Sequence, residues 1–305
     1  MALILQDATT DVRRVPVRPL KLEDANAMIM PPTNLYTPEA PHTATILSVR
    51  EISHQIYEIV FDHRGFMMYL EGQAFGVMVP PNPNNPFEPE RVSRRRIIFA
   101  ASSRYGEYFN GRSATICVSN EDDDETIKYL CDAKSGYHLQ LVGPTLTETL
   151  LGDSSPAAAT HIFVAKSGAA IAPFRAHLHR FFKEDIPTFK FSGDAWLFYG
   201  ARNNLQCRLY DEEFMQCEED NPQNFHYNFF IDILDRDAGG LGKMVFDMLV
   251  DNEAYIYLVG SQEMVDQVEV VFRGFAGSSN GQKCNWKEIK DELVSKNQWR
   301  VEIYD

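Results

Sequence analysis

The sequence predicts two domains, an antiparallel β-barrel followed by an α/β domain built on a parallel sheet. Its length is the first observation, since 305 residues correspond to about two domains. Short β-rich segments separated by turn residues fill the first half, a pattern typical of a small barrel. In the second half, strand-like segments alternate with helical ones, which indicates a parallel sheet with helices on both faces. We therefore expect an N-terminal tail over residues 1–43, a barrel over 44–150 and an α/β domain over 156–305.

The barrel strands are predicted from short runs of β-branched and aromatic residues. These runs cover residues 44–48, 56–61, 75–79, 96–101, 114–118 and 139–141. Prolines and asparagines over residues 80–89 indicate a loop between two strands. The acidic run at 121–125 is expected at a solvated hairpin tip.

The α/β domain is predicted from apolar runs that alternate with amphipathic stretches. Strands are expected at residues 161–165, 195–199, 228–233, 255–259 and 299–304. Helices are expected at residues 171–182, from 210, from 262 and at 285–296.

The N-terminal 43 residues show no sustained hydrophobic period. They contain Pro16, Pro19, Pro31, Pro32, Pro38 and Pro41. Proline favours extended backbone, so the segment either stays disordered or lies along a surface. We expect it to be an anchor that contacts a partner chain more than its own barrel.

Composition and charge exclude several classes of function. The chain has 44% hydrophobic and 24% charged residues, as globular proteins do, and no apolar run long enough to span a bilayer. Its 29 basic and 43 acidic residues give a net charge of −14, which argues against nucleic acid or anionic lipid as a partner. The five cysteines are odd in number and widely spaced, which favours reduced thiols in an intracellular or organellar compartment. The location that we expect is an organelle, a plastid or a mitochondrion.

Several short motifs follow one another in a fixed order along the chain. They are Glu71-Gly72-Gln73, Arg96-Ile97-Ile98-Phe99, Ala101-Ser102-Ser103, Val142-Gly143-Pro144, Gly168-Ala169-Ala170 before Ile171-Ala172-Pro173-Phe174, Trp196-Leu197-Phe198 and Val301-Glu302-Ile303-Tyr304. Over residues 44–304 this set resembles the plant-type ferredoxin–NADP reductase family. The resemblance implies FAD on the barrel, NADP on the second domain, and ferredoxin as the donor of single electrons.

The flavin motifs are altered relative to that family. In its R-x-Y-S motif the arginine pairs with the FAD pyrophosphate, and here Arg96 is kept while Ile98 and Phe99 replace the stacking tyrosine and the serine. Ser102 and Ser103 follow as further candidates for binding the cofactor. The other interpretation of this stretch is a buried β-strand.

A second family motif, G-x-C-S, holds the pyrophosphate at the start of a helix. The resemblance places it at residues 124–127, where Asp124 and Ile127 replace the glycine and the serine. A carboxylate facing a pyrophosphate is electrostatically unfavourable. Thr126 is expected to cap the helix that follows.

The nucleotide motifs of the second domain are partly kept. The family's G-T-G turn becomes Gly168-Ala169-Ala170, and Gly168 could offer N–H groups to a phosphate or serve only as a tight packing turn. Of the 2′-phosphate residues only Lys243 matches, because Asp232 and Ile233 replace the Ser-Arg pair. Arg202 and Arg236 could compensate. NADP, NAD and no nucleotide therefore all stay open.

The hydride-transfer residues are also replaced. Val259 stands at the position of the family's catalytic cysteine and Val265 at that of its glutamate, so neither a thiol nor a proton route is present there. Tyr304 matches the C-terminal aromatic residue that covers the flavin. His177 and His179 are two residues apart on a predicted helix and are not expected to bind a metal.

Scaffold motifs are thus kept while chemistry motifs change. This combination predicts a reductase-like protein that has lost catalysis and acts as a structural or accessory subunit of a redox assembly, held through residues 1–43. The alternative is an active FAD-dependent oxidoreductase that uses NADH or NADPH. An acidic ferredoxin is not expected to bind, because like charges oppose docking.

Overall fold

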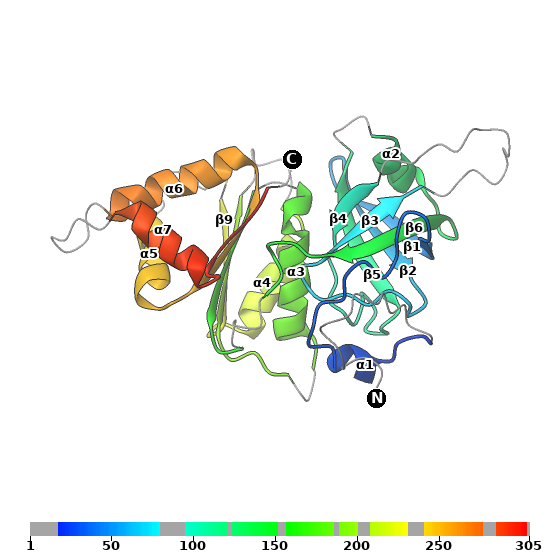
Figure 1. Ribbon diagram of the computed structural model, residues 1–305, viewed down its shortest axis with the longest axis horizontal. Coiled ribbons are helices and arrows are strands. Elements are labelled where there is room, and N and C mark those ends of the chain that lie inside the picture. Colours follow the sequence, from blue (N-terminus) through cyan, green and yellow to red (C-terminus); the bar gives the residue numbers. More distant parts are fainter. Residues whose placement is uncertain are drawn as a thin grey trace.

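A computed structural model describes residues 18–79, 95–120, 124–151, 157–166, 168–185, 189–200, 208–230, 241–276 and 285–303. The described chain forms two domains side by side, each built on one sheet (Figure 1). One sheet has six strands that pair in antiparallel fashion, and the other has five parallel strands. The predicted fold class is therefore confirmed.

The first sheet contains β1 (His42–Ser53), β2 (Ile56–Asp62), β3 (Ala74–Met78), β4 (Arg96–Phe99), β5 (Ser113–Ser119) and β6 (His138–Thr145). Their order is β4-β3-β6-β1-β2-β5, and a bridge between Ala100 and Ile116 joins the two edges. The sheet therefore curls into a barrel. Apolar side chains such as Phe61 and Phe75 are fully buried inside it.

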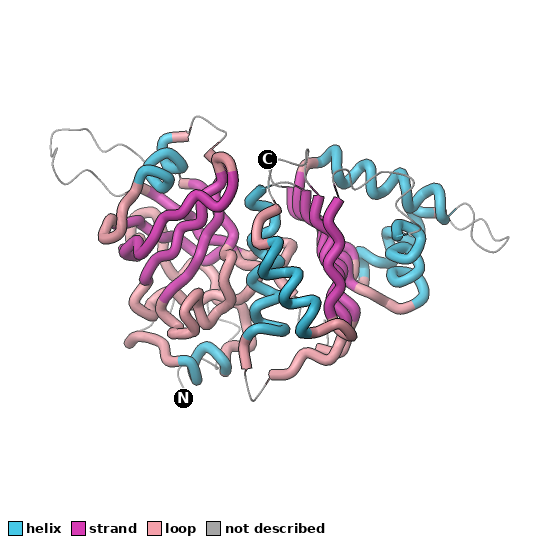
Figure 2. Tube along the Cα trace, turned by 180° about the vertical axis from the view of Figure 1, so that it is seen from behind, coloured by secondary structure: helices cyan, strands magenta, loops and turns pink. Residues whose placement is uncertain are grey.

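The second sheet contains β7 (Thr160–Lys166), β8 (Asp194–Gly200), β9 (Phe225–Phe230), β10 (Tyr255–Gly260) and β11 (Trp299–Ile303), in the order β11-β10-β7-β8-β9. Helices α3 (Ala172–Leu178) and α4 (Asp211–Asp220) lie between this sheet and the barrel (Figure 1). Helices α5 (Leu241–Asp251), α6 (Gln262–Ala276) and α7 (Trp286–Ser295) cover the opposite face, and Figure 2 shows the sheet between these two layers.

Local sequence explains the main boundaries of this domain. Central strands β7 and β10 are almost continuously apolar because both of their faces are covered. Asn285 caps α7 by accepting a hydrogen bond from the Lys287 amide. The predicted helix over 171–182 is observed in three pieces, the 3-10 turn η1 (Gly168–Ile171), α3 and the π-helical turn η2 (His179–Lys183).

Residues 18–43 lie on their own barrel, and the expected contact with a partner chain stays a prediction. They form a short helix, α1 (Leu22–Asn26), and bury Met28 and Leu35. Arg104 Nη1 donates to the Met28 carbonyl at 2.7 Å, and Tyr36 exchanges backbone hydrogen bonds with Gly143. Met28, Leu35 and Tyr36 join the barrel core, whereas Ile29 and Met30 are exposed. Residues 1–17 lie outside the described residues.

Other predicted details differ as well. The acidic run ends in a helix, α2 (Glu125–Asp132), and not in a hairpin tip. Helix α5 was not predicted, and residues 80–89 lie outside the described part of the chain. No helix that the structure describes has both the length and the apolar character needed to span a bilayer.

Candidate functional site at the domain interface

A continuous apolar core joins the barrel to the carboxyl ends of the parallel strands. The barrel contributes Ile56, Phe99 and Cys117 to it, and the sheet contributes Ala165 and Val259. Each of these side chains is less than 5% exposed. In open α/β sheets, ligands bind outside the carboxyl ends of the strands. Among the described residues, these barrel and sheet side chains belong to one cluster of buried residues.

A buried arginine ties the two domains together beside this core. Arg175 of α3 is 3% exposed and donates to the Ala101 carbonyl and to both carboxylate oxygens of Glu107, each at 2.9 Å. It also donates to Glu213 of α4 at 3.1 Å. Burial alone would raise the pKa of Glu107, but the bonds to Arg175 outweigh it and lower the pKa to about 2. The cluster is therefore an ion network that is charged at neutral pH.

Tyr210 fills the space next to this arginine. It precedes α4 with a left-handed backbone conformation, φ 59°, and its ring lies 4.4 Å from the Arg175 guanidinium carbon. Its hydroxyl lies 3.3 Å from Cys117 Sγ. Burial raises the pKa of Cys117 to about 12, so this thiol is not a nucleophile at neutral pH.

The turn that the resemblance assigns to a phosphate packs against the barrel. All four residues of η1 are buried, and a Cβ added to Gly168 would lie 3.2 Å from Ile56 Cδ1. Gly168 has φ +32°, a conformation that side chains rarely adopt. The structure therefore supports the packing interpretation of this glycine.

Arg96 is paired within the protein. Its Nε lies 2.8 Å from Asp124 Oδ2, while Asp124 Oδ1 accepts the amides of Thr126 and Ile127 at 2.9 and 3.0 Å. Asp124, and not Thr126 as predicted, is thus the cap of α2. Next along β4, Ile98 is buried in the barrel core.

The two serines after β4 have structural partners. Ser102 Oγ accepts the Thr115 amide at 2.9 Å and lies 2.9 Å from the Tyr69 hydroxyl. Ser103 Oγ donates to Glu184, whose pKa burial raises to about 7. Both serines are 0% exposed, so neither presents a free hydroxyl to a ligand in this conformation.

The two valines that replace catalytic residues lie in different cores. Val259 ends β10 at the domain interface, whereas Val265 of α6 faces the core beneath α5 and α7. The residue beside Val259 in the sheet is Glu302, whose carboxylate accepts the Glu148 amide at 2.8 Å. Burial raises the pKa of Glu302. A signal existed in the sequence, because Glu302 stands in the C-terminal stretch that carries the resemblance.

The remaining candidates lie away from the interface or outside the described residues. Lys243 of α5 is exposed and pairs with Asp247 on the same helix. Asp232, Ile233, Arg202, Arg236 and Tyr304 all lie outside the described residues. Among the described residues, no group of three or more His, Cys, Asp or Glu side chains could hold a metal ion.

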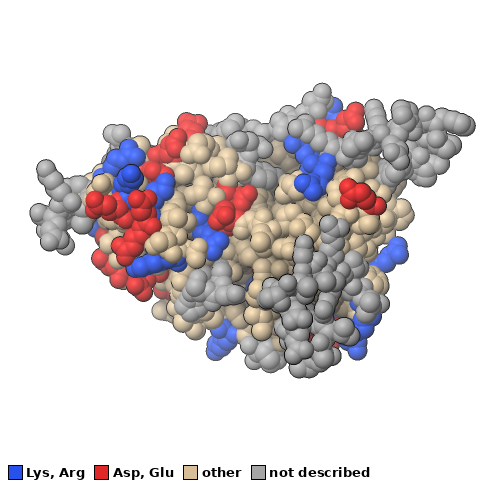
Figure 3. All heavy atoms as spheres, in the orientation of Figure 1, with Lys and Arg blue, Asp and Glu red and all other residues tan. Residues whose placement is uncertain are grey.

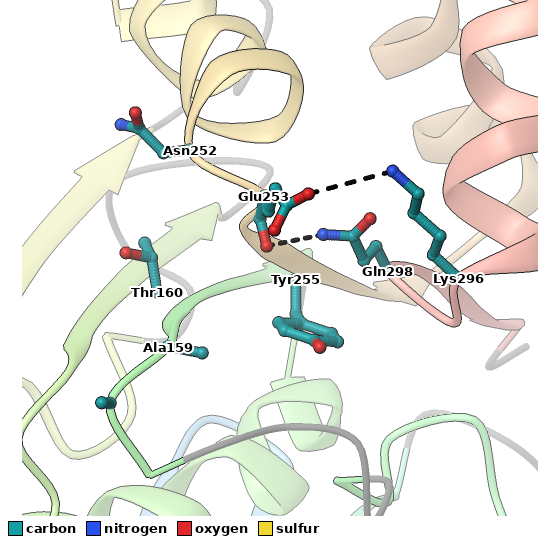
Figure 4. A pocket seen from close by; sticks show the side chains of 8 residues that line it. Ala159, Thr160, Asn252, Glu253, Tyr255, Lys296 and Gln298 are labelled. Carbon is teal, nitrogen blue, oxygen red and sulfur yellow. Dashed lines mark hydrogen bonds and ion pairs between the residues drawn. The ribbon is translucent and has the colours of Figure 1, made fainter.

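A hollow of about 390 Å³ lies at the other end of the sheet, where β7 and β10 begin (Figure 4). Lys296 Nζ lies 4.0 Å from Glu253 Oε1, and Gln298 Nε2 donates to the Glu253 carbonyl at 2.6 Å. These polar groups are engaged with one another. The hollow is also remote from the carboxyl ends of the strands, so it is not the nucleotide site of this fold.

Comparison with known proteins identifies the family. A family model for the oxidoreductase NAD-binding domain matches residues 164–269. The chloroplastic embryo isozyme of ferredoxin–NADP reductase from Oryza sativa subsp. japonica is 36% identical over 321 residues, which cover 95% of this chain and 82% of the relative. The chain belongs to the ferredoxin–NADP reductase family. The chloroplastic root isozyme 1 from Arabidopsis thaliana has the same identity and coverage.

Solved structures of this reductase family share the fold. Ferredoxin-NADP+ reductase from Plasmodium falciparum superposes with a TM-score of 0.67 at 19% identity, over 89% of this chain and 99% of that chain. The structure of that reductase with 2'P-AMP gives a TM-score of 0.69 at 17% identity and the same coverage. At these identities the likeness concerns the fold alone.

The site residues do not fit FAD, the flavin that the resemblance implies. No aromatic side chain stands at Ile98, and the carboxylate of Asp124 already engages Arg96 and the start of α2. Phe99 belongs to the core that the two domains share, and Tyr210 packs against that core. Ile98 offers no aromatic ring to the flavin ring. Asp124 takes the position of the flavin phosphates, and Phe99 and Tyr210 lie in the space between the domains.

Proposed function

We propose that this member of the ferredoxin–NADP reductase family has lost flavin-dependent catalysis and serves as a structural or accessory subunit of a redox assembly. One observation carries the proposal. Phe99 and Cys117 of the barrel and Val259 of the sheet belong to one buried apolar core, where the two cofactors would meet. A subunit with a rigid two-domain body and no exchangeable cofactor suits a role in assembly.

Opening that core would be costly. Burying a large apolar side chain contributes about 1.5–3 kcal/mol, so exposing several of them costs as much as a small domain's net stability. The Arg175 network adds to this cost, because separating the domains would leave the barrel carboxylate of Glu107 without its cation. FAD, NADP and NAD would each have to offset this cost in order to bind.

The charge of the protein supports a partner other than an acidic ferredoxin. Net charge is −14, and on the face shown in Figure 3 basic and acidic side chains are intermixed over the second domain. Like net charges slow encounter and oppose docking. We propose that no salt-sensitive complex with an acidic ferredoxin forms. A titration at low and high salt tests this, and tight binding lost at high salt would contradict it.

An organellar location, in a plastid, is part of the proposal. It is supported by the chloroplastic isozymes from Oryza sativa and Arabidopsis thaliana, which match 95% of this chain. Localisation of a fluorescent fusion expressed from the complete gene tests it, and a signal outside organelles would refute it.

A second candidate function is an active FAD-dependent oxidoreductase that uses NADH or NADPH. Two observations favour it. The chain is 36% identical to proteins named as ferredoxin–NADP reductases, and Glu302, a carboxyl group of raised pKa, lies beside Val259 at the carboxyl end of the sheet. Such a group could hold a proton near a reacting atom.

Flavin content and turnover distinguish the two functions. The protein is purified without added cofactor and again with excess FAD, and the flavin-to-protein ratio is read from absorbance. NADPH and NADH oxidation is then measured with ferricyanide as acceptor. The rice embryo isozyme, prepared in parallel, is the positive control. We expect a colourless protein without turnover. Stoichiometric FAD together with NADPH oxidation would establish the second function.

A further inference from the structure

The first turn of α2 holds a carboxylate from its own chain. Asp124 is 6% exposed, and one of its oxygens accepts the amides of Thr126 and Ile127. Its other oxygen lies 2.8 Å from Arg96 Nε. Two elements, β4 and α2, therefore bring a guanidinium and two backbone amides to one carboxylate. In Figure 1, α2 lies at the top of the barrel near β4.

These donors are of the kinds that bind phosphate groups. Free N–H groups at a helix start carry partial positive charge and hold anions, and a guanidinium adds charge-assisted hydrogen bonds. Asp124 accepts the two amides and forms an ion pair with the guanidinium. A phosphate could reach them only if the carboxylate moved away, and two negative groups would repel each other at that position.

We propose that Asp124 is an internal anion that blocks a latent diphosphate site formed by Arg96 and the start of α2. The inference rests on the proposed function, because it names the residue that keeps the flavin phosphates out. Arg96 and the amides at the start of α2 are still in place, and only the Asp124 side chain keeps a phosphate from reaching them.

Substitutions at Asp124 test this directly. Asp124→Ser and Asp124→Gly remove the carboxylate and leave residues that cap helices well. Asp124→Asn removes the charge but keeps a side chain of the same shape in the site. Asp124→Ser combined with Arg96→Gln removes the cation as well. Asn285→Ser changes the cap of α7 and is the matched control for a change of helix cap.

Inorganic pyrophosphate is the probe, measured by isothermal titration at low salt and by amide shifts at residues 126 and 127. We expect Asp124→Ser and Asp124→Gly to bind it at least about tenfold tighter than the unmodified protein, as one charge-assisted hydrogen bond would give. The Asp124→Asn, double and Asn285→Ser variants should bind no tighter than the unmodified protein. Circular dichroism and thermal unfolding establish that each variant is folded.

Two outcomes would overturn the inference. One is equal pyrophosphate affinity in the unmodified protein and in the folded Asp124→Ser and Asp124→Gly variants. The other is a gain that survives Arg96→Gln in full. Neither readout uses flavin or turnover. If the unmodified protein lacks FAD and these variants still fail to bind pyrophosphate, only the inference fails. If the unmodified protein binds FAD and turns over, the proposed function fails.

Discussion

Replacing Arg175 with methionine should weaken the protein more than any exposed arginine substitution. Arg175 is 3% exposed and holds Glu107 and Glu213, which are 18% and 26% exposed. Methionine fills a similar volume and removes the charge. Breaking a buried ion pair by removing one partner costs about 3–5 kcal/mol. Because both carboxylates keep some contact with water, we expect a loss near the lower end of that range.

The pKa of Glu107 gives an independent estimate of the same quantity. It is lowered from 4.5 to about 2, and each unit corresponds to about 1.4 kcal/mol, so the ionised form gains roughly 3.5 kcal/mol on folding, after the cost of burial. A lowered carboxyl pKa stabilises the folded state above pH 4.5, and this contribution is lost as the pH falls through 2. The difference between Arg175→Met and the unmodified protein should therefore shrink in acid.

Urea unfolding followed by tryptophan fluorescence and circular dichroism, at pH 7 and at pH 3, measures both effects. Arg112→Met is the matched control, because Arg112 pairs with Asp62 at 2.8 Å but is 53% exposed. Such surface pairs contribute about 0–1 kcal/mol. If Arg175→Met lowers the free energy of unfolding no more than Arg112→Met at pH 7, the Arg175 ion network does not stabilise the interface as its geometry implies.

Three further outcomes are expected. Stability should fall as pH rises from 4.5 towards 7, because the pKa of Glu184 is raised to about 7, and Glu184→Gln should flatten that part of the pH–stability curve from thermal unfolding. Deleting residues 1–40 should lower the melting temperature of the body, since the deletion exposes barrel side chains that residues 25–36 cover, whereas deleting residues 1–17 removes none of those contacts. Gly106→Ala should unfold at much lower temperature, because its φ is +80° and the new Cβ would lie 2.2 Å from the Ser113 carbonyl oxygen.

The strands and the longer helices were predictable because local pattern decides them. The run from 255 to 259 is apolar since both faces of β10 are covered, and α7 begins where Asn285 caps it. The short helix α1 was not predicted, because five residues are too few to show a helical repeat of apolar residues. It forms where its Ala25 meets Tyr105 of the barrel domain.

The state of the site could not be predicted from the sequence, because distant residues decide it. Nothing in the local sequence places Tyr210 against Cys117, which is 93 residues away. Likewise, the register of two parallel strands brings Glu302, and not Val265, beside Val259. Motif matching identifies which family residues are replaced. It does not show that the replaced positions have closed into a core.

The order β11-β10-β7-β8-β9 has a consequence for synthesis on the ribosome. All six barrel strands are complete by residue 145, whereas β10 lacks one neighbour until β11, the last strand, leaves the exit tunnel. The barrel face that carries Ile56 and Phe99 belongs to a core that is completed only by Tyr257 and Val259 of β10. During synthesis, the barrel side of the core shared by the two domains therefore stays exposed until the sheet has formed. A chaperone would bind the nascent chain at this stage.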